Sequence, residues 1–286
     1  PVQDVLAQKR SECIGTCPIS SEEDCYQNPL VVAALTVGQG GWTHVLHLTS
    51  DNLTVSGGGV NVFSMTSGGV DVSGRKLILQ DITATSSISG GTIFDFVGSG
   101  ELDVKSTSVN TNLSITDSTG AVTIDANMVI SGTGSNPSSV GVGQFSSSSL
   151  TFASNRGITV NTGGILQLQQ TNSGGGTSGG IVRTSDTTSY LITVNGGTVN
   201  RGNNTTGGLW GAQIVGAPID LKSGTINLYQ GTQVKVTGEN SSSQAVLVEG
   251  GTLNFLEGSL GGSLGNSSGY LNCTATGAKV EASGGT

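Results

Sequence analysis

The chain repeats one short sequence at a fixed interval, and this repeat limits the possible folds more than any other feature. The tetrapeptide Gly-Thr-(Val/Ile/Leu)-Asn occurs at 197–200, 224–227 and 251–254, so successive copies lie 27 positions apart. Each copy follows an apolar run of the kind that forms β-strands. A fixed period in this range is typical of solenoids, in which each repeat forms one coil and stacks on the next.

Looser relatives of the repeat lie earlier in the chain, at 69–72, 91–94, 120–123 and 164–167. Their spacing predicts coils of roughly 20–35 residues with loops of variable length. We expect equivalent strands of successive coils to pair in parallel, so that equivalent residues form columns along the axis. The predicted fold is therefore all-β, with a β-solenoid over residues 30–286 and a short Cys-containing arm or cap over residues 1–29.

The repeat predicts three such columns. The aliphatic position is expected to face inward and to form a stack of Val199, Ile226 and Leu253. The glycine position is expected at a corner that needs a positive φ or a close backbone approach, at Gly197, Gly224 and Gly251. The amides of Asn200, Asn227 and Asn254 either bond to one another as a ladder or simply face solvent.

The Gly-Thr-(Val/Ile/Leu)-Asn repeats, separated by Ser/Thr-rich loops, resemble those of right-handed parallel β-helix proteins of the pectin-lyase-like type. In style they look most like autotransporter passenger domains and polymorphic outer-membrane adhesins. The resemblance covers about residues 30–286. It implies a single-stranded right-handed parallel β-helix with an extracellular surface role, and it implies no reaction.

Composition and charge narrow the partners. The chain has 11 Lys and Arg against 19 Asp and Glu, for a net charge of −8. Nucleic-acid binding is disfavoured, because phosphate neutralisation needs clustered basic residues. The longest apolar run, Leu30 to Val37, contains Thr36 and is too short to span a bilayer, so we expect no membrane span. Charged residues make up only 10% of the chain, which suits a thin solenoid core with a Gly-, Ser- and Thr-rich surface.

Cysteines and glycosylation sequons indicate the compartment. The even number of cysteines, Cys13, Cys17, Cys25 and Cys273, favours two disulfides with undetermined connectivity, and their spacing lacks the His partners of a zinc site. Sequons for N-linked glycans occur at Asn52, Asn112, Asn203, Asn204, Asn240, Asn266 and Asn272. Together these features predict a secreted or cell-surface glycoprotein. A bacterial solenoid with chance sequons is the alternative.

The residues that could carry chemistry are isolated. Single carboxylates lie in predicted strands at Asp71, Asp95, Asp103, Asp125 and Asp220, and adjacent coils could bring two of them together. His44 and His47 face opposite sides of a strand and make a poor metal pair. We therefore predict no catalytic site, metal or cofactor.

Three functions remain open. The first is an extracellular structural protein that self-associates head to tail, with Cys273 bonded to an N-terminal cysteine of the next subunit. The second is an adhesin that binds glycans or host surfaces through loops such as 133–139, 171–180 and 202–216, the last of which contains Trp210. The third is a polysaccharide lyase or hydrolase.

Overall fold

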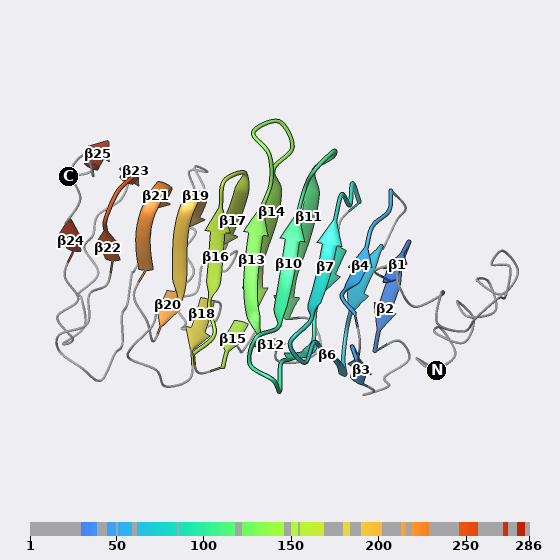
Figure 1. Cartoon of the computed structure of the whole chain (residues 1–286). Coiled ribbons are helices and arrows are strands. Elements are labelled where there is room, and N and C mark those ends of the chain that lie inside the picture. Colours follow the sequence, from blue (N-terminus) through green and yellow to red (C-terminus); the bar gives the residue numbers. More distant parts are fainter. Residues whose placement is uncertain are drawn as a thin grey trace, which may run out of the picture.

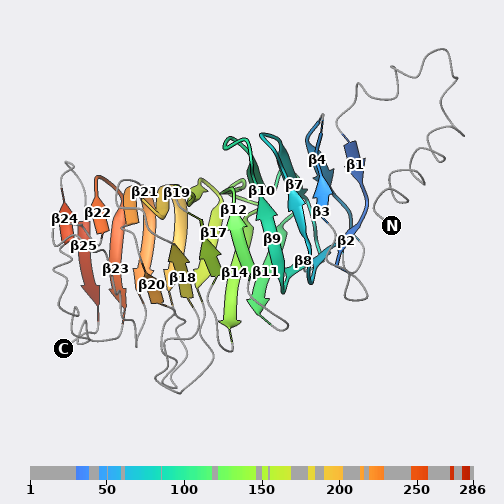
Figure 2. The ribbon, with the colours of Figure 1, turned by 90° about the horizontal axis from the view of Figure 1, so that it is seen from below.

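The chain forms a parallel β-solenoid, seen from the side in Figures 1 and 2. The structure, a computed structural model, describes residues 30–38, 45–49, 51–58, 62–84, 86–117, 122–145, 150–153, 155–168, 180–183, 190–201, 213–215, 219–228, 246–256, 271–273 and 279–283. These residues contain strands and no helix, which confirms the predicted all-β solenoid. The predicted arm or cap over 1–29, with Cys13, Cys17 and Cys25, lies outside the described residues.

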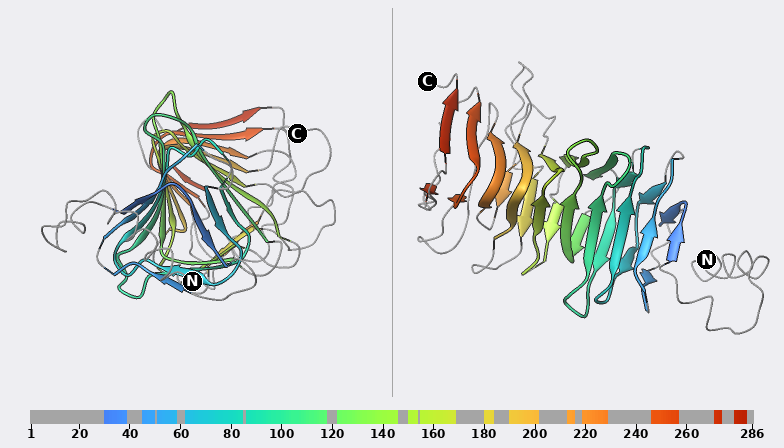
Figure 3. Two further views of the ribbon diagram at one scale, coloured as in Figure 1. Left: turned by 90° about the vertical axis from the view of Figure 1, so that its right-hand side faces the viewer. Right: turned by 45° about the horizontal axis from the view of Figure 1, so that its top comes forward.

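The described strands form three stacks, which surround the core when the solenoid is viewed from its end (Figure 3). The first stack contains β1 (Leu30–Val32), β4 (Leu53–Val55), β7 (Lys76–Gln80), β10 (Glu101–Lys105), β13 (Asn127–Ser131), β16 (Ile158–Asn161), the first halves of β19 (Ile192–Arg201) and β21 (Ile219–Leu228), β22 (Val246–Val248) and β24 (Leu271–Cys273).

The second stack contains β2 (Leu35–Val37), β5 (Phe63–Met65), β8 (Ser86–Ile88), β11 (Thr111–Asp117), β14 (Ser138–Phe145), β17 (Gly164–Leu168), the second halves of β19 and β21, β23 (Thr252–Leu256) and β25 (Lys279–Ser283). Because β19 and β21 run through the corner between these stacks, the two stacks form one 18-stranded sheet.

The third stack is a separate 7-stranded sheet. It contains β3 (Val45–His47), β6 (Gly69–Asp71), β9 (Gly91–Phe94), β12 (Val122–Asp125), β15 (Leu150–Phe152), β18 (Gly180–Arg183) and β20 (Gln213–Val215). Of the looser repeat relatives, only 164–167 lies in the same stack as the Gly-Thr-(Val/Ile/Leu)-Asn copies, and the strands at 69–72, 91–94 and 120–123 belong to this third stack. Glycine followed by a short apolar run marks a corner and a strand, but not which stack the strand joins.

The predicted aliphatic column is confirmed. Val199 pairs with Ile226, which pairs with Leu253, and all three side chains are buried. The column continues toward the N-terminus through Leu166 and Val140, which are also buried. The predicted coil length is confirmed as well, since paired residues of the first stack are separated by 23 positions at Leu30↔Leu53 and by 34 at Ile158↔Ile192.

The asparagine column is a ladder, so the first of the two alternatives holds. The side-chain Nδ2 of Asn227 donates to Oδ1 of Asn200 at 2.8 Å, and Nδ2 of Asn254 donates to Oδ1 of Asn227 at 2.9 Å. The ladder runs along the outer face of the second stack, one residue after the buried aliphatic column. Each bond crosses from one coil to the next and so helps to fix the register.

The glycine column lies at the corner between the first and second stacks. Gly224 and Gly251 have φ of 92° and 82°, as predicted. In the preceding coil the positive φ of 90° belongs to Gly196, because β19 has one more residue than β21 between Asn195 and Thr198. Gly197 instead makes the close approach, since a Cβ there would lie 2.6 Å from the carbonyl oxygen of Asn161.

Three glycine-to-alanine substitutions would separate strain from steric overlap. Gly134→Ala is expected to change the free energy of unfolding by less than about 0.5 kcal/mol, since its Cβ meets nothing within 4 Å and its φ is not positive. Gly98→Ala, with φ 91° but open space, is expected to cost about 1–2 kcal/mol. Gly224→Ala is expected to cost more than Gly98→Ala, because its Cβ would lie 2.2 Å from the carbonyl oxygen of Gly197. Chemical denaturation measures all three, and equal losses at Gly98 and Gly224 would contradict the steric account.

Candidate functional site

Several predicted site residues fall in the described strands. Asn272 and Cys273 lie on β24, in register with Leu247 and with Val248, respectively. The Oδ1 of Asn52 accepts a hydrogen bond from the backbone N–H of Lys76 at 2.9 Å, so this side chain links two coils. The remaining sequons, Asn203, Asn204, Asn240 and Asn266, lie outside the described residues. Asn112 lies half-buried on β11.

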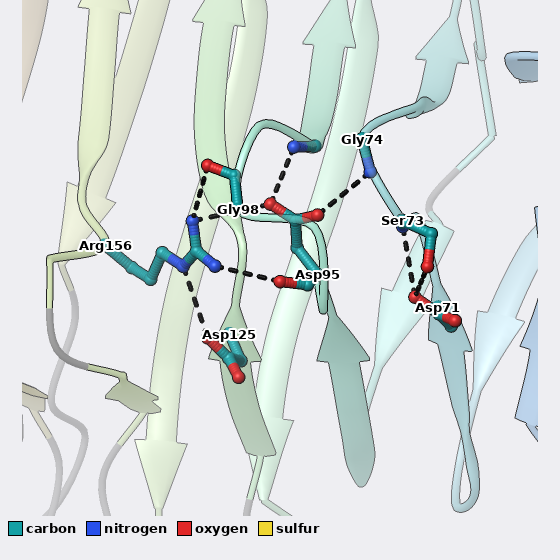
Figure 4. A network of polar contacts seen from close by, with 8 residues as sticks. Asp71, Ser73, Gly74, Asp95, Gly98, Asp125 and Arg156 are labelled. Atoms are coloured by element: carbon teal, nitrogen blue, oxygen red, sulfur yellow. Dashed lines mark hydrogen bonds and ion pairs between the residues drawn. The ribbon is translucent and has the colours of Figure 1, made fainter.

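The stacking brings isolated carboxylates together at the corner between the third and first stacks. Asp71 pairs with Phe94, and Phe94 pairs with Asp125, so these positions lie on three successive coils. Asp95 follows Phe94 directly, at the start of the turn that leads to β10. Arg156, one coil after Asp125, reaches back over this corner (Figure 4). We call Asp95, Asp125 and Arg156 the corner clamp.

The centre of the corner clamp is the buried carboxylate of Asp95, whose side chain is 0% exposed. Its Oδ1 accepts from the backbone N–H of Gly74 at 3.0 Å, and its Oδ2 accepts from that of Gly100 at 2.6 Å. The guanidinium of Arg156 lies 3.4 Å from the same Oδ2 and is only 12% exposed. Both oxygens of this buried carboxylate therefore accept hydrogen bonds from fixed backbone donors.

Arg156 completes the clamp by binding backbone as well as side chains. Its Nη2 donates to the carbonyl oxygen of Asp95 at 3.0 Å, and its Nη1 donates to that of Gly98 at 3.2 Å. Its Nε donates to Oδ1 of Asp125 at 3.2 Å. One side chain therefore holds the turn between β9 and β10 closed and ties it to two later coils.

The central carboxylate of the clamp, Asp95, is not arranged for acid–base catalysis. Proton transfer needs a carboxyl oxygen that can reach a substrate, and both oxygens of Asp95 are buried and already accept hydrogen bonds. Asp125 is bound by the same guanidinium that neutralises Asp95. The geometry is that of a structural clamp between coils.

A second polar cluster surrounds Asp71. Its Oδ2 lies 2.9 Å from Nδ1 of His47, and its Oδ1 accepts from the backbone N–H of Ser73 at 3.0 Å and from the Ser73 hydroxyl at 2.7 Å. Burial opposes ionisation of Asp71, but the hydrogen bonds from Ser73 and His47 outweigh it and lower the pKa. The carboxylate lies between the imidazole and the hydroxyl, so His47 is not the base that would activate Ser73.

No group of ligands suited to a metal ion occurs among the described residues. His44, the other predicted histidine, lies outside them.

Two carboxylates on the outer face of the first stack, half-buried Asp103 and buried Asp220, differ from the rest. Asp103 and Asp220 each have one buried oxygen without a hydrogen-bond partner. Burial raises the pKa of both side chains; nearby lysines oppose this at Asp103, and Glu249 adds to it at Asp220. They share one column but are separated by Val129, Thr159 and Thr193.

This separation decides whether the two carboxylates could act together. Four coil steps of ~4.8 Å place them about 19 Å apart. A glycosidase needs its two carboxyl groups about 5–10 Å apart. Asp103 and Asp220 therefore cannot form the acid pair of a hydrolase, although each is a chemically unusual site.

Sequence reasoning did not identify Arg156 as a site residue. It lies 31 positions after Asp125, about one coil length, and a search for opposite charges at coil spacing would have found it. Sequence reasoning did not identify Asp81 either. Its φ is 53°, and its carboxylate accepts from the backbone N–H groups of Thr107, Ser108 and Val109 one coil later.

Comparison with known proteins gives no relative: no family, curated protein or solved structure matches this chain. Its kinship to pectin-lyase-like or autotransporter proteins therefore remains a resemblance in repeat style. In the part of the chain that the structure describes, no helix has the length and hydropathy needed to cross a membrane.

Breaking the corner clamp on one side should destabilise the protein strongly. Arg156→Met leaves the buried Asp95 carboxylate without its counter-charge, and the expected loss is about 3–5 kcal/mol. The double variant Asp95→Asn with Arg156→Met is expected to lose less than the sum of the two single variants, as a coupled pair requires. Equilibrium denaturation measures this cycle, and strict additivity would show that the ion pair carries no coupling.

Stability should also depend on Asp81 in acid. Burial opposes ionisation of Asp81, but the hydrogen bonds from Thr107 and Ser108 lower its pKa well below the ordinary value of 3.8. Because the folded-state pKa is lowered, the stabilisation is complete above the unfolded value of ~3.9 and is lost as the pH falls toward the folded value.

Asp81→Asn should therefore cost about 1–3 kcal/mol at pH 7 and much less near pH 2. Unfolding free energies of both proteins at the two pH values test this, with Asp51→Asn, an exposed position, as the control. A cost that stays the same at both pH values would contradict the charge-based account.

Proposed function

We propose that the chain is an extracellular structural β-solenoid and not an enzyme, a glycosylated subunit that assembles head to tail into filaments with disulfide support. The observation that carries this proposal is the match between the two ends of the stacks. Among the described strands, β1 and β2 pair on one side only, with β4 and β5. At the other end of the described part of the chain, β24 pairs with β22 and β25 with β23, and neither has a second described partner. Unpaired strand edges favour pairing with a further chain.

The residue types at the two ends continue the columns. If the register of the first stack ran on into a second subunit, Leu271 and Cys273 would lie beside Leu30 and Val32. In the second stack, the inward columns of Leu35 and Val37 end at Val280 and Ala282. At the first end, Val32 and Val37 are buried apolar residues at these register positions. A heterologous contact of this kind gives an open fibre when the rotation does not close.

The use of the carboxylates supports a structural role. Asp71, Asp81 and Asp95 serve as links within and between coils, and their oxygens accept hydrogen bonds from neighbouring turns. Cys273 lies at an inward register position of the last described strand of the first stack, where a bond to a cysteine of the next subunit would close the junction. N-linked glycans at the predicted sequons and an extracellular location belong to the same proposal.

Adhesion is the second candidate, favoured by one exposed apolar pair. Phe96 is 71% exposed and Val97 is 67% exposed, in the turn that the corner clamp holds closed. The ring of Phe96 stacks on Phe94, with centroids 5.5 Å apart. An exposed aromatic residue held by a rigid turn is typical of a binding hot spot and suits the face of a sugar ring or a protein surface.

Electron microscopy of the full-length chain tests the structural proposal. Head-to-tail assembly predicts rods longer than one subunit, shortened by reducing agents and abolished by Val280→Asp, which would place a charge in the junction. Val97→Asp, at an exposed position away from both ends, is the control. Circular dichroism confirms that each variant folds. Monomers alone at high protein concentration, or Cys273 bonded to a cysteine of its own subunit, would contradict the proposal.

A further inference from the structure

A shallow depression of about 430 Å³ lies on the corner between the first and second stacks, and it contains one of the predicted glycosylation sites. Its lining consists of Thr83, Val109, Asn110, Asn112, Ser135 and Asn136. These residues come from three successive coils, and Asn112 begins the sequon Asn112-Leu113-Ser114. The loops on either side, which join β10 to β11 and β13 to β14, rise from the same edge of the solenoid (Figure 1).

Both walls of the depression are held in place by hydrogen bonds. The turn that carries Val109 is bound by the carboxylate of Asp81 through three backbone N–H groups. The turn that carries Asn136 is closed on itself, since Thr133 N–H donates to the Asn136 carbonyl and Asn136 N–H donates to the Thr133 hydroxyl, both at 3.0 Å. The backbone of both walls is therefore held in place before any ligand binds.

The two walls are also bound to each other. The hydroxyl of Ser106 donates to the carbonyl of Pro137 at 3.1 Å and lies 2.9 Å from the hydroxyl of Ser138. The backbone N–H of Thr111 donates to the same Pro137 carbonyl at 3.3 Å. These contacts fix the distance between the walls that a ligand would meet.

The lining is neutral, with hydroxyls, amides and one apolar side chain. Val109 is 37% exposed and offers an apolar surface beside the amides of Asn110 and Asn136. This mixture matches a sugar ring, which has hydroxyl groups at its rim and C–H groups on its faces. Among the described residues, no hydrogen bond engages the side-chain amide of Asn112.

We propose that this depression is the seat of the first sugar of a glycan attached to Nδ2 of Asn112. In the attachment step Nδ2 loses a proton and bonds to the anomeric carbon of a lipid-diphosphate-linked oligosaccharide, whose carbon–oxygen bond breaks to release the lipid diphosphate. The first sugar then packs on Val109 and hydrogen-bonds to Thr83, Ser135 and Asn136. The inference rests on the proposed extracellular location, since a secretory pathway supplies the oligosaccharide donor and the transferase.

The test uses the full-length chain secreted from a eukaryotic host. Peptide mass spectrometry after enzymatic deglycosylation gives the occupancy of Asn112 and Asn52. The rate of glycan release from the native protein is then measured at both sites. We expect both to be occupied and release from Asn112 to be severalfold slower, because the seated sugar is shielded from the glycosidase.

The lining is tested by the double variant Thr83→Ala with Val109→Ser, and Val97→Ser is the matched control at an exposed valine outside the depression. The double variant should speed release at Asn112 severalfold and leave Asn52 unchanged. Release in the unfolded protein should be equally fast at both sites.

Each other outcome overturns a definite part of the proposal. An empty Asn112 with an occupied Asn52, or equal release rates in the native wild-type protein, would overturn the seat and leave the extracellular location standing. A chain without glycans at any sequon would overturn both. If the double variant fails to fold, the comparison of native and unfolded wild-type protein still decides the matter.

Discussion

The parallel, in-register pairing of successive coils is the constraint on which the rest of the structure depends. Once Val194 pairs with Leu221 and Val199 with Ile226, every position in a coil stands over its equivalent in the next. An inward position is then apolar in most coils, and an outward polar position can meet its own kind. The asparagine ladder is the direct consequence, because the amides at 200, 227 and 254 can satisfy one another.

The corners use two different devices to keep this register while coil length varies. Toward the C-terminus, the corner between the first and second stacks is formed by glycines with positive φ, among them Gly163, Gly196 and Gly224. In an earlier coil, the carboxylate of Asp81 lies at this same corner and holds the longer turn of the next coil through backbone N–H groups. Glycine lets the chain turn within one or two residues. A carboxylate stabilises a turn of several residues because its oxygens accept hydrogen bonds from the backbone N–H groups of that turn.

This difference explains how much could be predicted from the sequence. The three copies at 197–200, 224–227 and 251–254 are 27 positions apart, so the aliphatic column, the glycine column and the fold class could be predicted from them. The carboxylates and the groups that they bind do not recur at a fixed interval in the sequence, because turns of different length lie between them. Arg156 and Asp95 are 61 positions apart, and only the coil lengths between them bring them together.

For a related reason, the sequence could not predict which polar residues are buried in inward columns. Ser86 pairs with Leu113 in an inward column and is fully buried, with its hydroxyl unpaired among the described residues. A serine in a Ser/Thr-rich strand suggests a solvent-facing position, and only the register shows otherwise. Ile78 is the converse case. It lies on the outward side of β7 between two inward leucines, and yet its side chain is buried, with only 8% of the residue exposed. Alternation in three-residue strands is too short a signal to separate such cases.

The same constraint bears on function. In a stack of coils, a reactive pair must come from neighbouring coils, yet the carboxylates on neighbouring coils at the clamped corner are already bound by Arg156 and by backbone N–H groups. The carboxylates with unpaired oxygens, Asp103 and Asp220, stand four coils apart. The described corners instead carry turns held by hydrogen bonds, and the exposed side chains of Phe96 and Val97 lie on the turn that Arg156 binds.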